Sequence, residues 1–337
     1  MAGHDIVVMG ASAGGIPPIE RVLSALPSHF PAAVFITIHT AAEGPRLLSD
    51  VLNRMSSLPV SYAMDGDTVR KSRVYLAPPD RHMLLDNGVI RVTAGPRENR
   101  HRPAIDPLFR SAARAYGSRV VAVVFSGLLD DGTAGLKAIS RHGCISIVQD
   151  PEEARFASMP LNAMENDSPK YVLPVQQIGP TLVRLVGNGH RRENGGGEGD
   201  SEINNEVKIA EIDMSAIEHT KPGKPSPYVC PECNGTLWEI REGELLRFRC
   251  RVGHAYGAES LLSAKNEELE GALWTALRTL EEKSALHRRL AEKAQAGQNL
   301  RVAKNFRASA EDMHQQAQTI RNLLLEREQP PLTGTEN

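Results

Sequence analysis

Three side chains that together could carry out acyl transfer lie far apart in the sequence, each after a run of apolar residues. Ser12 follows the run at 6–9, His39 ends the next run, and Asp130 and Asp131 follow the run "VVAVVF". A serine becomes a nucleophile when a base accepts its proton, and the base needs an acid that fixes its tautomer. Residues that follow neighbouring parallel strands converge at one edge of the sheet, which favours a Ser–His–Asp site. The same residues also fit a surface histidine and an ordinary Asp N-cap, so residue types alone leave both interpretations open.

The glycine-rich stretch "GASAGG" at 10–15 is compatible with several kinds of site. A dinucleotide fingerprint requires G-x-G-x-x-G, but Ala11 and Ser12 follow Gly10, and the next strand ends in His39 rather than an acid. A phosphate-binding loop would require a lysine after Gly15. The stretch does match the nucleophile turn G-x-S-x-G. In α/β-hydrolases, however, that turn follows several strands and the triad order is Ser, Asp or Glu, His. We therefore expect a serine held up by a strand-to-helix turn outside that superfamily.

A second group of residues has the spacing of metal ligands. Cys230 and Cys233 are separated by two residues, and "CRVGH" later supplies Cys250 and His254. Two such pairs are typical of a zinc ribbon in which one imidazole replaces a thiolate. Because the protein supplies all four ligands, the sequence predicts a structural Zn²⁺ and no cofactor for catalysis.

Between the two metal-binding pairs, the sequence predicts a β-hairpin that turns at "REGE". Trp238, Ile240, Leu246 and Phe248 are all even-numbered. The expectation is that they share one buried face. Cys144 stands alone in an apolar run and is expected to belong to the core of the larger domain.

The elements that must position these residues alternate between strands and helices. This alternation predicts an α/β fold with a doubly wound, mostly parallel sheet and helices on both faces. The expected strands lie at 6–9, 33–38, 74–76, 120–125, 144–148 and 171–173, and the expected helices at 16–26, 44–55, 105–116 and 131–142.

The remainder of the chain differs in composition, which predicts further domains. The boundaries that we expect are a catalytic domain at 1–187, a flexible linker at 188–227, a zinc-ribbon module at 228–256, a helical hairpin at 257–327 and a disordered tail at 328–337. The linker prediction rests on the polar, Gly-rich segment from 187 to 206, with a weakly helical piece after it. The apolar stripes expected to join the two helices are Leu269, Leu273, Leu277, Leu280, Leu286 and Leu290 on the first, and Val302, Phe306, Met313, Ile320 and Leu324 on the second.

Composition excludes some classes of function. A net charge of −2 gives no basic excess of the kind that a nucleic-acid-binding domain shows. No apolar stretch reaches the ~20 residues needed to cross a bilayer, and the N-terminus lacks a signal-peptide pattern. We therefore expect a cytoplasmic protein that neither binds nucleic acid nor inserts into a membrane, and clustered thiols agree with a reducing compartment.

Seven motifs in one order resemble the catalytic domain of the chemotaxis-type protein-glutamate methylesterases (CheB). They are "GASAGG" at 10–15, "IH" at 38–39, "MDGD" at 64–67, "VYLAPPDRHMLL" at 74–85, "RPAIDPLFRSAA" at 102–113, "FSGLLDDGTAGL" at 125–136 and "QDPEEARFASMP" at 149–160. The resemblance covers roughly residues 4–187. It implies that Ser12, His39 and Asp131 form the catalytic triad.

The resemblance also implies a substrate and a reaction. Members of this family remove methyl esters from glutamyl side chains on the signalling helices of methyl-accepting chemoreceptors, and many also deamidate glutamine there. Both reactions are acyl transfers through a serine. The developing oxyanion needs backbone N–H donors, for which Ala13 and Leu128 are the candidates.

The sequence departs from the family pattern at several places. The family's Gly-Met-Gly-x-Asp-Gly is replaced by "GLLDDG" at 127–132, so Leu129 stands where a glycine is usual and Asp130 adds a competing carboxylate beside Asp131. The family's proline soon after the histidine is missing, and no receiver domain precedes the catalytic domain. We therefore expect no phosphorelay control in cis. The C-terminal module could instead supply regulation or docking.

The leading prediction is a serine hydrolase of the protein-glutamate methylesterase type, with protein-glutamine glutaminase activity as a second reaction. The alternative is a catalytically weak signalling scaffold that keeps the CheB-like fold and binds a partner through its zinc and helical module. The altered turn at Leu128 and Leu129 motivates this alternative.

Overall fold

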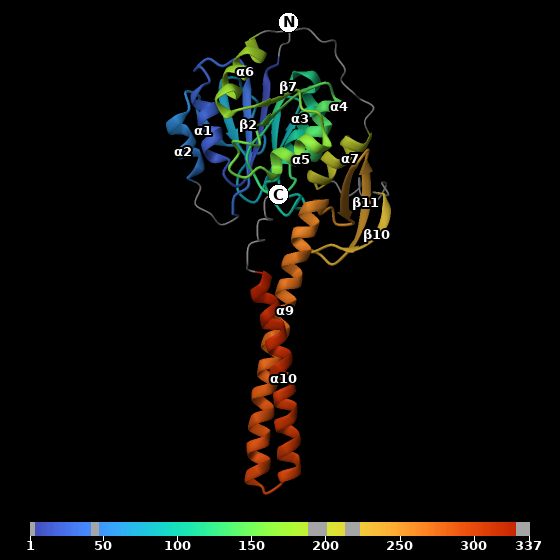
Figure 1. Ribbon diagram of the computed structural model, residues 1–337. Helices are drawn as coiled ribbons and strands as arrows, with labels where there is room; N and C mark the ends of the chain where they lie inside the picture. Colours follow the sequence, from blue (N-terminus) through green and yellow to red (C-terminus); the bar gives the residue numbers. More distant parts are fainter. Residues whose placement is uncertain (1–3, 42–46, 188–200, 213–222, 328–337) are drawn as a thin grey trace, which may run out of the picture. The chain divides into compact units, whose positions relative to one another are not determined.

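The computed structural model describes residues 4–41, 47–187, 201–212 and 223–327. The chain forms two compact units, Met1–Leu261 and Leu262–Asn337 (Figure 1). The predicted tail and much of the predicted linker lie outside the described residues.

The larger unit is built on a seven-stranded parallel sheet with the order β3-β4-β2-β1-β7-β8-β9. Its strands are β1 (Ile6–Ala11), β2 (Ala33–Ile38), β3 (Val60–Tyr62), β4 (Arg73–Leu76), β7 (Val120–Val124), β8 (Ile145–Gln149) and β9 (Tyr171–Leu173). The predicted doubly wound α/β fold is confirmed. The expectation missed the short edge strand β3 and a separate antiparallel pair, β5 (His82–Asp86) and β6 (Val89–Thr93).

Helices cover both faces of the sheet because side chains of successive strand residues point to opposite faces. Ile6 and Val8 belong to one apolar core, and Val7 and Met9 to the other. The first core is covered by α3 (Ile105–Tyr116), α4 (Thr133–Arg141) and α5 (Ser158–Asn166), and the second by α1 (Ile16–Ser24), α2 (Leu48–Met55) and α6 (Val175–Gly187) (Figure 1). The chain leaves β1 and β7 toward opposite faces, which opens a crevice at their carboxyl ends.

A second, four-stranded antiparallel sheet contains the predicted hairpin. Its strands are β10 (Lys224–Val229), β11 (Thr236–Glu242), β12 (Leu245–Cys250) and β13 (Ala255–Gly257). The expectation that Trp238, Ile240, Leu246 and Phe248 share one face is wrong. Glu242 pairs with Leu245 across a two-residue turn, so even-numbered residues of β11 lie opposite odd-numbered residues of β12. Trp238 therefore pairs with Arg249, and the buried Phe248 lies on the other face.

The predicted flexible linker at 188–227 contains a helix, α7 (Ser201–Ala210), and β10 begins inside it. Ile203, Val207 and Ala210 of this helix are buried, and Ile203 belongs to the core that α3 and α4 cover. The carbonyl of Ala210 accepts a hydrogen bond from the Thr93 hydroxyl at 2.6 Å. The sequence suggested only a weakly helical piece after residue 206, whereas the helix begins at Ser201 inside the expected Gly-rich linker. Tertiary packing, rather than local composition, stabilises so short a helix.

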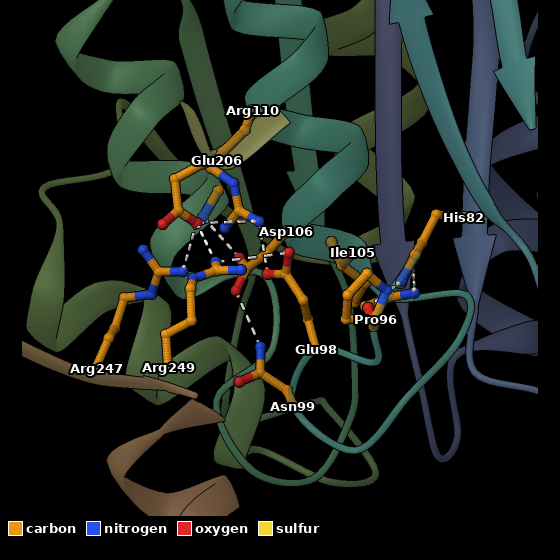
Figure 2. Close-up of polar contacts among 12 residues, drawn as sticks. His82, Pro96, Glu98, Asn99, Ile105, Asp106, Arg110, Glu206, Arg247 and Arg249 are labelled. Atoms are coloured by element: carbon orange, nitrogen blue, oxygen red, sulfur yellow. Dashed lines mark hydrogen bonds and ion pairs between the residues drawn. The ribbon is translucent and has the colours of Figure 1, made fainter. Parts of the chain in front are cut away.

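A buried cluster of charged side chains joins α3, α7 and β12 (Figure 2). Glu206 of α7 lies 3.0 Å from Arg247 and also bonds to Arg249. Burial alone would raise the pKa of Glu206, but Arg249, Arg247 and Arg110 lower it well below its usual range. Two further close ion pairs of the cluster are Arg110 with Glu98 at 2.5 Å and Arg247 with Glu242 at 2.7 Å. Three guanidinium groups thus face three carboxylates, and all six side chains are buried.

The C-terminal helices α9 (Ala258–Ala296) and α10 (Leu300–Arg327) form the predicted antiparallel hairpin. The most buried residues of α10 recur every seven residues along one side of the helix: Ala303, Ala310, Ala317 and Leu324. The expected stripe is correct at Leu277 and Leu324, which are buried, and at Leu273, Leu280 and Ile320, which pack against them. Leu269, Leu286 and Val302 are exposed. The search for large apolar side chains missed the three alanines of this row, although small residues let two helices approach closely. None of the helices in the described part of the chain is long and apolar enough to span a membrane.

Neutralising Glu206 should destabilise the larger unit, because three buried guanidinium groups would lose a shared counter-charge. We expect Glu206→Gln to lower the free energy of unfolding by about 3–5 kcal/mol. The control is Glu211→Gln, which removes a partly exposed pair with Arg114 at 3.6 Å and should cost less than about 1 kcal/mol. Urea unfolding followed by circular dichroism measures both. Equal effects of the two variants would contradict the assigned role of the cluster.

Candidate active site

Ser12 lies in the turn between β1 and α1, at the carboxyl edge of the sheet. Ser126, just after β7, holds this turn in two ways. Its carbonyl accepts the Ser12 N–H at 3.1 Å, and its hydroxyl donates to the Ala13 carbonyl at 2.9 Å. Gly14 has a φ of +71°, which few side chains tolerate, and a Cβ on Gly127 would lie 2.9 Å from the Ser12 Cβ. The glycines therefore shape the turn, as the sequence suggested.

The three predicted triad residues are hydrogen-bonded in one chain. His39 Nδ1 lies 2.9 Å from Ser12 Oγ, and His39 Nε2 lies 2.6 Å from Asp131 Oδ2. The side chains of His39 and Asp131 are almost fully buried. Three segments separated by 27 and 92 residues thus meet as the topology predicts.

Asp131 is held as an anion by donors from several segments. Its carboxylate accepts the backbone N–H of Ile105 at 2.7 Å and of Asp106 at 3.3 Å, at the start of α3, and the Asn99 amide at 2.9 Å. Burial alone would raise the pKa of Asp131. The hydrogen bonds from His39, Ile105 and Asn99 and the charge of His39 outweigh burial and hold this pKa far below its usual value.

The ionised state of Asp131 decides the tautomer of His39. A carboxylate only accepts hydrogen bonds, so His39 Nε2 must carry the proton that points to Asp131. The lone pair of Nδ1 then faces Ser12 Oγ. In its neutral form the imidazole is therefore oriented to accept the serine proton.

Two residues beside the triad were not predicted from the sequence. The ring of His101 stacks on His39 with centroids 3.6 Å apart and planes 13° apart. Burial and the neighbouring His39 lower the pKa of His101 to about 3, so this ring is neutral near pH 7. Asn99 contacts Asp131 directly. Both residues belong to the polar segment "ENRHRPAID" at 98–106, which leads into α3, the helix whose first N–H groups donate to Asp131.

Asp130 does not compete with Asp131 for His39, contrary to the concern raised by "GLLDDG". Its carboxylate accepts the backbone N–H of Glu259 at 3.1 Å and the hydroxyl of Ser260, and so caps the first turn of α9. Burial is the main cause that raises the pKa of Asp130 to about 6.

The loop after β7 carries the second candidate oxyanion donor. The N–H of Gly127 already donates to Phe156 at 3.0 Å, which removes it as a donor and leaves Leu128 as the candidate on this loop. Leu129 has a φ of +63°, a left-handed conformation that favours glycine, the residue usual at this position in the family. Ser158 and Asn162 of α5 donate to the Leu129 carbonyl at 3.3 and 3.1 Å and hold the loop in this conformation.

The four predicted metal ligands converge at one end of the small sheet, with their ligand atoms within 4.8 Å of one another. The Cys230 and Cys250 thiols lie 3.7 and 3.6 Å from His254 Nδ1, and the Cys233 and Cys250 thiols are 3.6 Å apart. Tetrahedral zinc at ordinary bond lengths would separate such atoms by about 3.6–3.8 Å. The donor set and spacing therefore fit zinc. Cys144 lies outside this cluster and packs against the core that α3, α4 and α5 cover, and burial raises the pKa of its thiol to about 12.

A doubly wound sheet that brings a hydrogen-bonded Ser–His–Asp chain to its topological switch point has the arrangement of a serine hydrolase. The family described as CheB methylesterase matches residues 7–182, just over half of the 337 residues. The chain therefore belongs to the CheB methylesterase family, and the remaining residues carry an additional C-terminal region.

Solved and curated relatives match the same part of the chain. The crystal structure of the Thermotoga maritima CheB methylesterase catalytic domain is 32% identical, with a TM-score of 0.52, and the match covers 55% of this chain and all of that domain. Protein-glutamate methylesterase/protein-glutamine glutaminase 4 of Anaeromyxobacter dehalogenans is 38% identical over 54% of this chain and 52% of its own length. A Leptospira interrogans protein provisionally named for the same two activities is 33% identical over 54% of this chain and 95% of its own length.

The raised pKa of Asp130 predicts a specific dependence of stability on pH. The folded protein takes up a proton near pH 6, whereas the unfolded chain takes it up near 3.8. The free energy of unfolding of the wild type should therefore increase, relative to that of Asp130→Asn, as the pH falls from 7 to 4. The difference should be on the order of 2–3 kcal/mol. Denaturation curves of both proteins at several pH values measure it, and parallel pH profiles would contradict the assignment.

Proposed function

We propose that this protein is a protein-glutamate methylesterase whose catalytic residues are Ser12, His39 and Asp131. The observation that carries the proposal is the continuous hydrogen-bonded chain from Ser12 Oγ through His39 to Asp131. The family membership and the names of the relatives support the same reaction.

In the proposed reaction, His39 Nδ1 accepts the proton of Ser12 as the serine oxygen attacks the ester carbonyl of a glutamyl side chain. Asp131 stabilises the imidazolium that forms. His39 then returns the proton to the leaving methoxide, so methanol departs and the glutamyl group stays on Ser12. Water activated by His39 hydrolyses this acyl-enzyme and releases glutamate. A glutamine side chain follows the same course, with ammonia as the leaving group.

The backbone N–H groups of Ala13 and Leu128 are the proposed oxyanion donors. Ala13 follows Ser12 in its turn, and Leu128 lies on the loop after β7, where the neighbouring Gly127 closely approaches Ser12. The N–H of Gly127 donates to the Phe156 carbonyl and is therefore not free to bind the oxyanion. The left-handed backbone at Leu129 preserves the loop in which Leu128 lies.

The proposed substrate is a methylated glutamyl side chain on the signalling helices of a chemoreceptor. This finer assignment comes from the family and from the activity in the relatives' names. Such a substrate would place the protein in the cytoplasm. A catalytically weak scaffold is the less favoured alternative, because the tautomer of His39 and the ionised Asp131 are set up for proton transfer.

We further propose that residues 1–187 form the catalytic domain and that the module at 228–256 binds one structural Zn²⁺ through Cys230, Cys233, Cys250 and His254. The four converging ligand atoms support this assignment. A metal here would stabilise a small sheet whose first strand, β10, is largely exposed.

Replacing the proposed nucleophile should abolish activity without affecting the fold. We expect Ser12→Ala to reduce methanol release from a methylated chemoreceptor helix by at least about 1,000-fold, because no acyl-enzyme can form. The matched control is Ser24→Ala, which changes an exposed serine of α1. Labelling by a serine-directed fluorophosphonate probe should require both Ser12 and His39. Near wild-type turnover of Ser12→Ala would refute the proposed mechanism, and absence of labelling in the wild type would favour the scaffold.

Metal analysis tests the proposed zinc site. The purified full chain should contain about one zinc per molecule, and Cys233→Ser should lose most of it because three ligands bind zinc more weakly than four. Cys144→Ser, which changes the thiol outside the cluster, should retain the metal. Thermal unfolding of the chelator-treated protein should shift to lower temperature. A metal-free wild type with unchanged stability after zinc addition would exclude the site.

A further inference from the structure

The C-terminal module reaches the residues that hold the catalytic aspartate. Strand β13 begins directly after the metal ligand His254 and lies beside the loop that carries Asn99. The N–H of Ala255 donates to the Arg97 carbonyl at 3.2 Å, and the N–H of Asn99 donates to the Ala255 carbonyl at 2.8 Å. The module thus supplies backbone hydrogen bonds to a segment of the catalytic domain.

The side chain of Asn99 connects the two parts. Its Oδ1 accepts the N–H of Gly257 at 2.8 Å, and its Nδ2 donates to Asp131 and Asp106 at 2.9 Å each. An amide has one acceptor end and one donor end. Because Gly257 occupies the acceptor end with an N–H, the donor end must point at the carboxylates. The backbone of the module therefore determines which end of Asn99 faces Asp131.

Two further features make this contact depend on the module. Asn99 has a φ of +49°, an unfavourable conformation for a residue with a side chain, and its N–H donates to the Ala255 carbonyl of the module. Gly257 is packed so closely that a Cβ there would lie 2.0 Å from Asp130 Oδ2. On the other side, the second metal-binding turn is held by Arg249, which donates to the Gly253 carbonyl at 2.9 Å and pairs with Glu206. Figure 2 shows Asn99 next to this charged cluster.

We propose that Asn99 is a positioning residue for Asp131 and that the metal-binding module, through Gly257, holds Asn99 in its productive orientation. The inference rests on the proposed catalytic role of Asp131. It makes the small sheet part of the active-site structure. Loss of the metal would free His254, release β13 from the loop at 97–99 and weaken the hold on Asp131, so occupancy of the metal site would set the turnover number.

The test uses the full chain and compares Asn99→Gly with the wild type. Glycine tolerates the positive φ, so this change removes the amide while leaving the backbone unstrained. We expect kcat for methanol release to fall about 10- to 100-fold, the effect of losing one hydrogen bond to a charged group, with KM changed less than about twofold. The matched control is Asn87→Gly, which changes an exposed asparagine that also has a positive φ, in the β5–β6 turn.

A spectroscopic readout separates positioning from general damage. The His39 Nε2 proton in its hydrogen bond to Asp131 should give a downfield proton NMR resonance, identified by its loss in Asp131→Asn. This resonance should shift or broaden in Asn99→Gly, and equally in the wild type after chelation of zinc, while Asn87→Gly leaves it in place. Chelation should lower kcat of the wild type to the level of Asn99→Gly. It should lower kcat of Asn99→Gly little further, because both changes remove the same hydrogen bond from Asn99 to Asp131.

Unchanged kcat and an unchanged resonance in Asn99→Gly would overturn the proposed role of Asn99, even if Ser12→Ala is inactive and the proposed function stands. If Asn99→Gly lowers kcat but chelation of zinc does not, the proposed dependence of turnover on the metal site is overturned. Activity retained by Ser12→Ala would instead refute the catalytic assignment itself. The three failures are therefore distinguishable.

Discussion

The buried, ionised carboxylate of Asp131 is the constraint on which the rest of the site depends. A charge in the interior is costly unless donors surround it, and here the donors come from His39, from Asn99 and from the start of α3. These groups belong to segments distant in the sequence, so each segment must be placed before the anion is stable. In return, the anion fixes the tautomer of His39 and leaves a lone pair facing Ser12.

Helix α3, whose first N–H groups donate to Asp131, also contributes to the buried cluster of charged side chains around Glu206. Asp106 lies in the first turn of α3, while Arg110, one turn later, pairs with Glu98 and approaches Glu206. Burial and the nearby Asp131 raise the pKa of Asp106 to about 7. The seven-stranded α/β part of the chain, α7 and the small antiparallel sheet thus share one electrostatic interior. Removing any of them would leave buried charges without partners.

Much of the fold followed from local patterns. Alternating apolar strands and helices predicted the doubly wound sheet because strands buried on both faces require apolar residues at nearly every position. The features that were missed depend on distant contacts. Helix α7 lies in a polar segment and forms against a core made elsewhere. The pairing of Trp238 with Arg249 depends on the length of one turn, which shifts every partner by a residue.

The sequence by itself determined the chemistry that is available: a serine in a glycine-rich turn, a histidine and an aspartate after neighbouring strands, and three cysteines and a histidine at the spacing of zinc-ribbon ligands. Only the tertiary structure decided which carboxylate serves His39. Asp130 and Asp131 are adjacent and identical in type, yet the first caps α9 and the second faces His39. The donors that distinguish them lie more than 20 residues away in the sequence, at Glu259 and at Ile105, where no local pattern could reveal them.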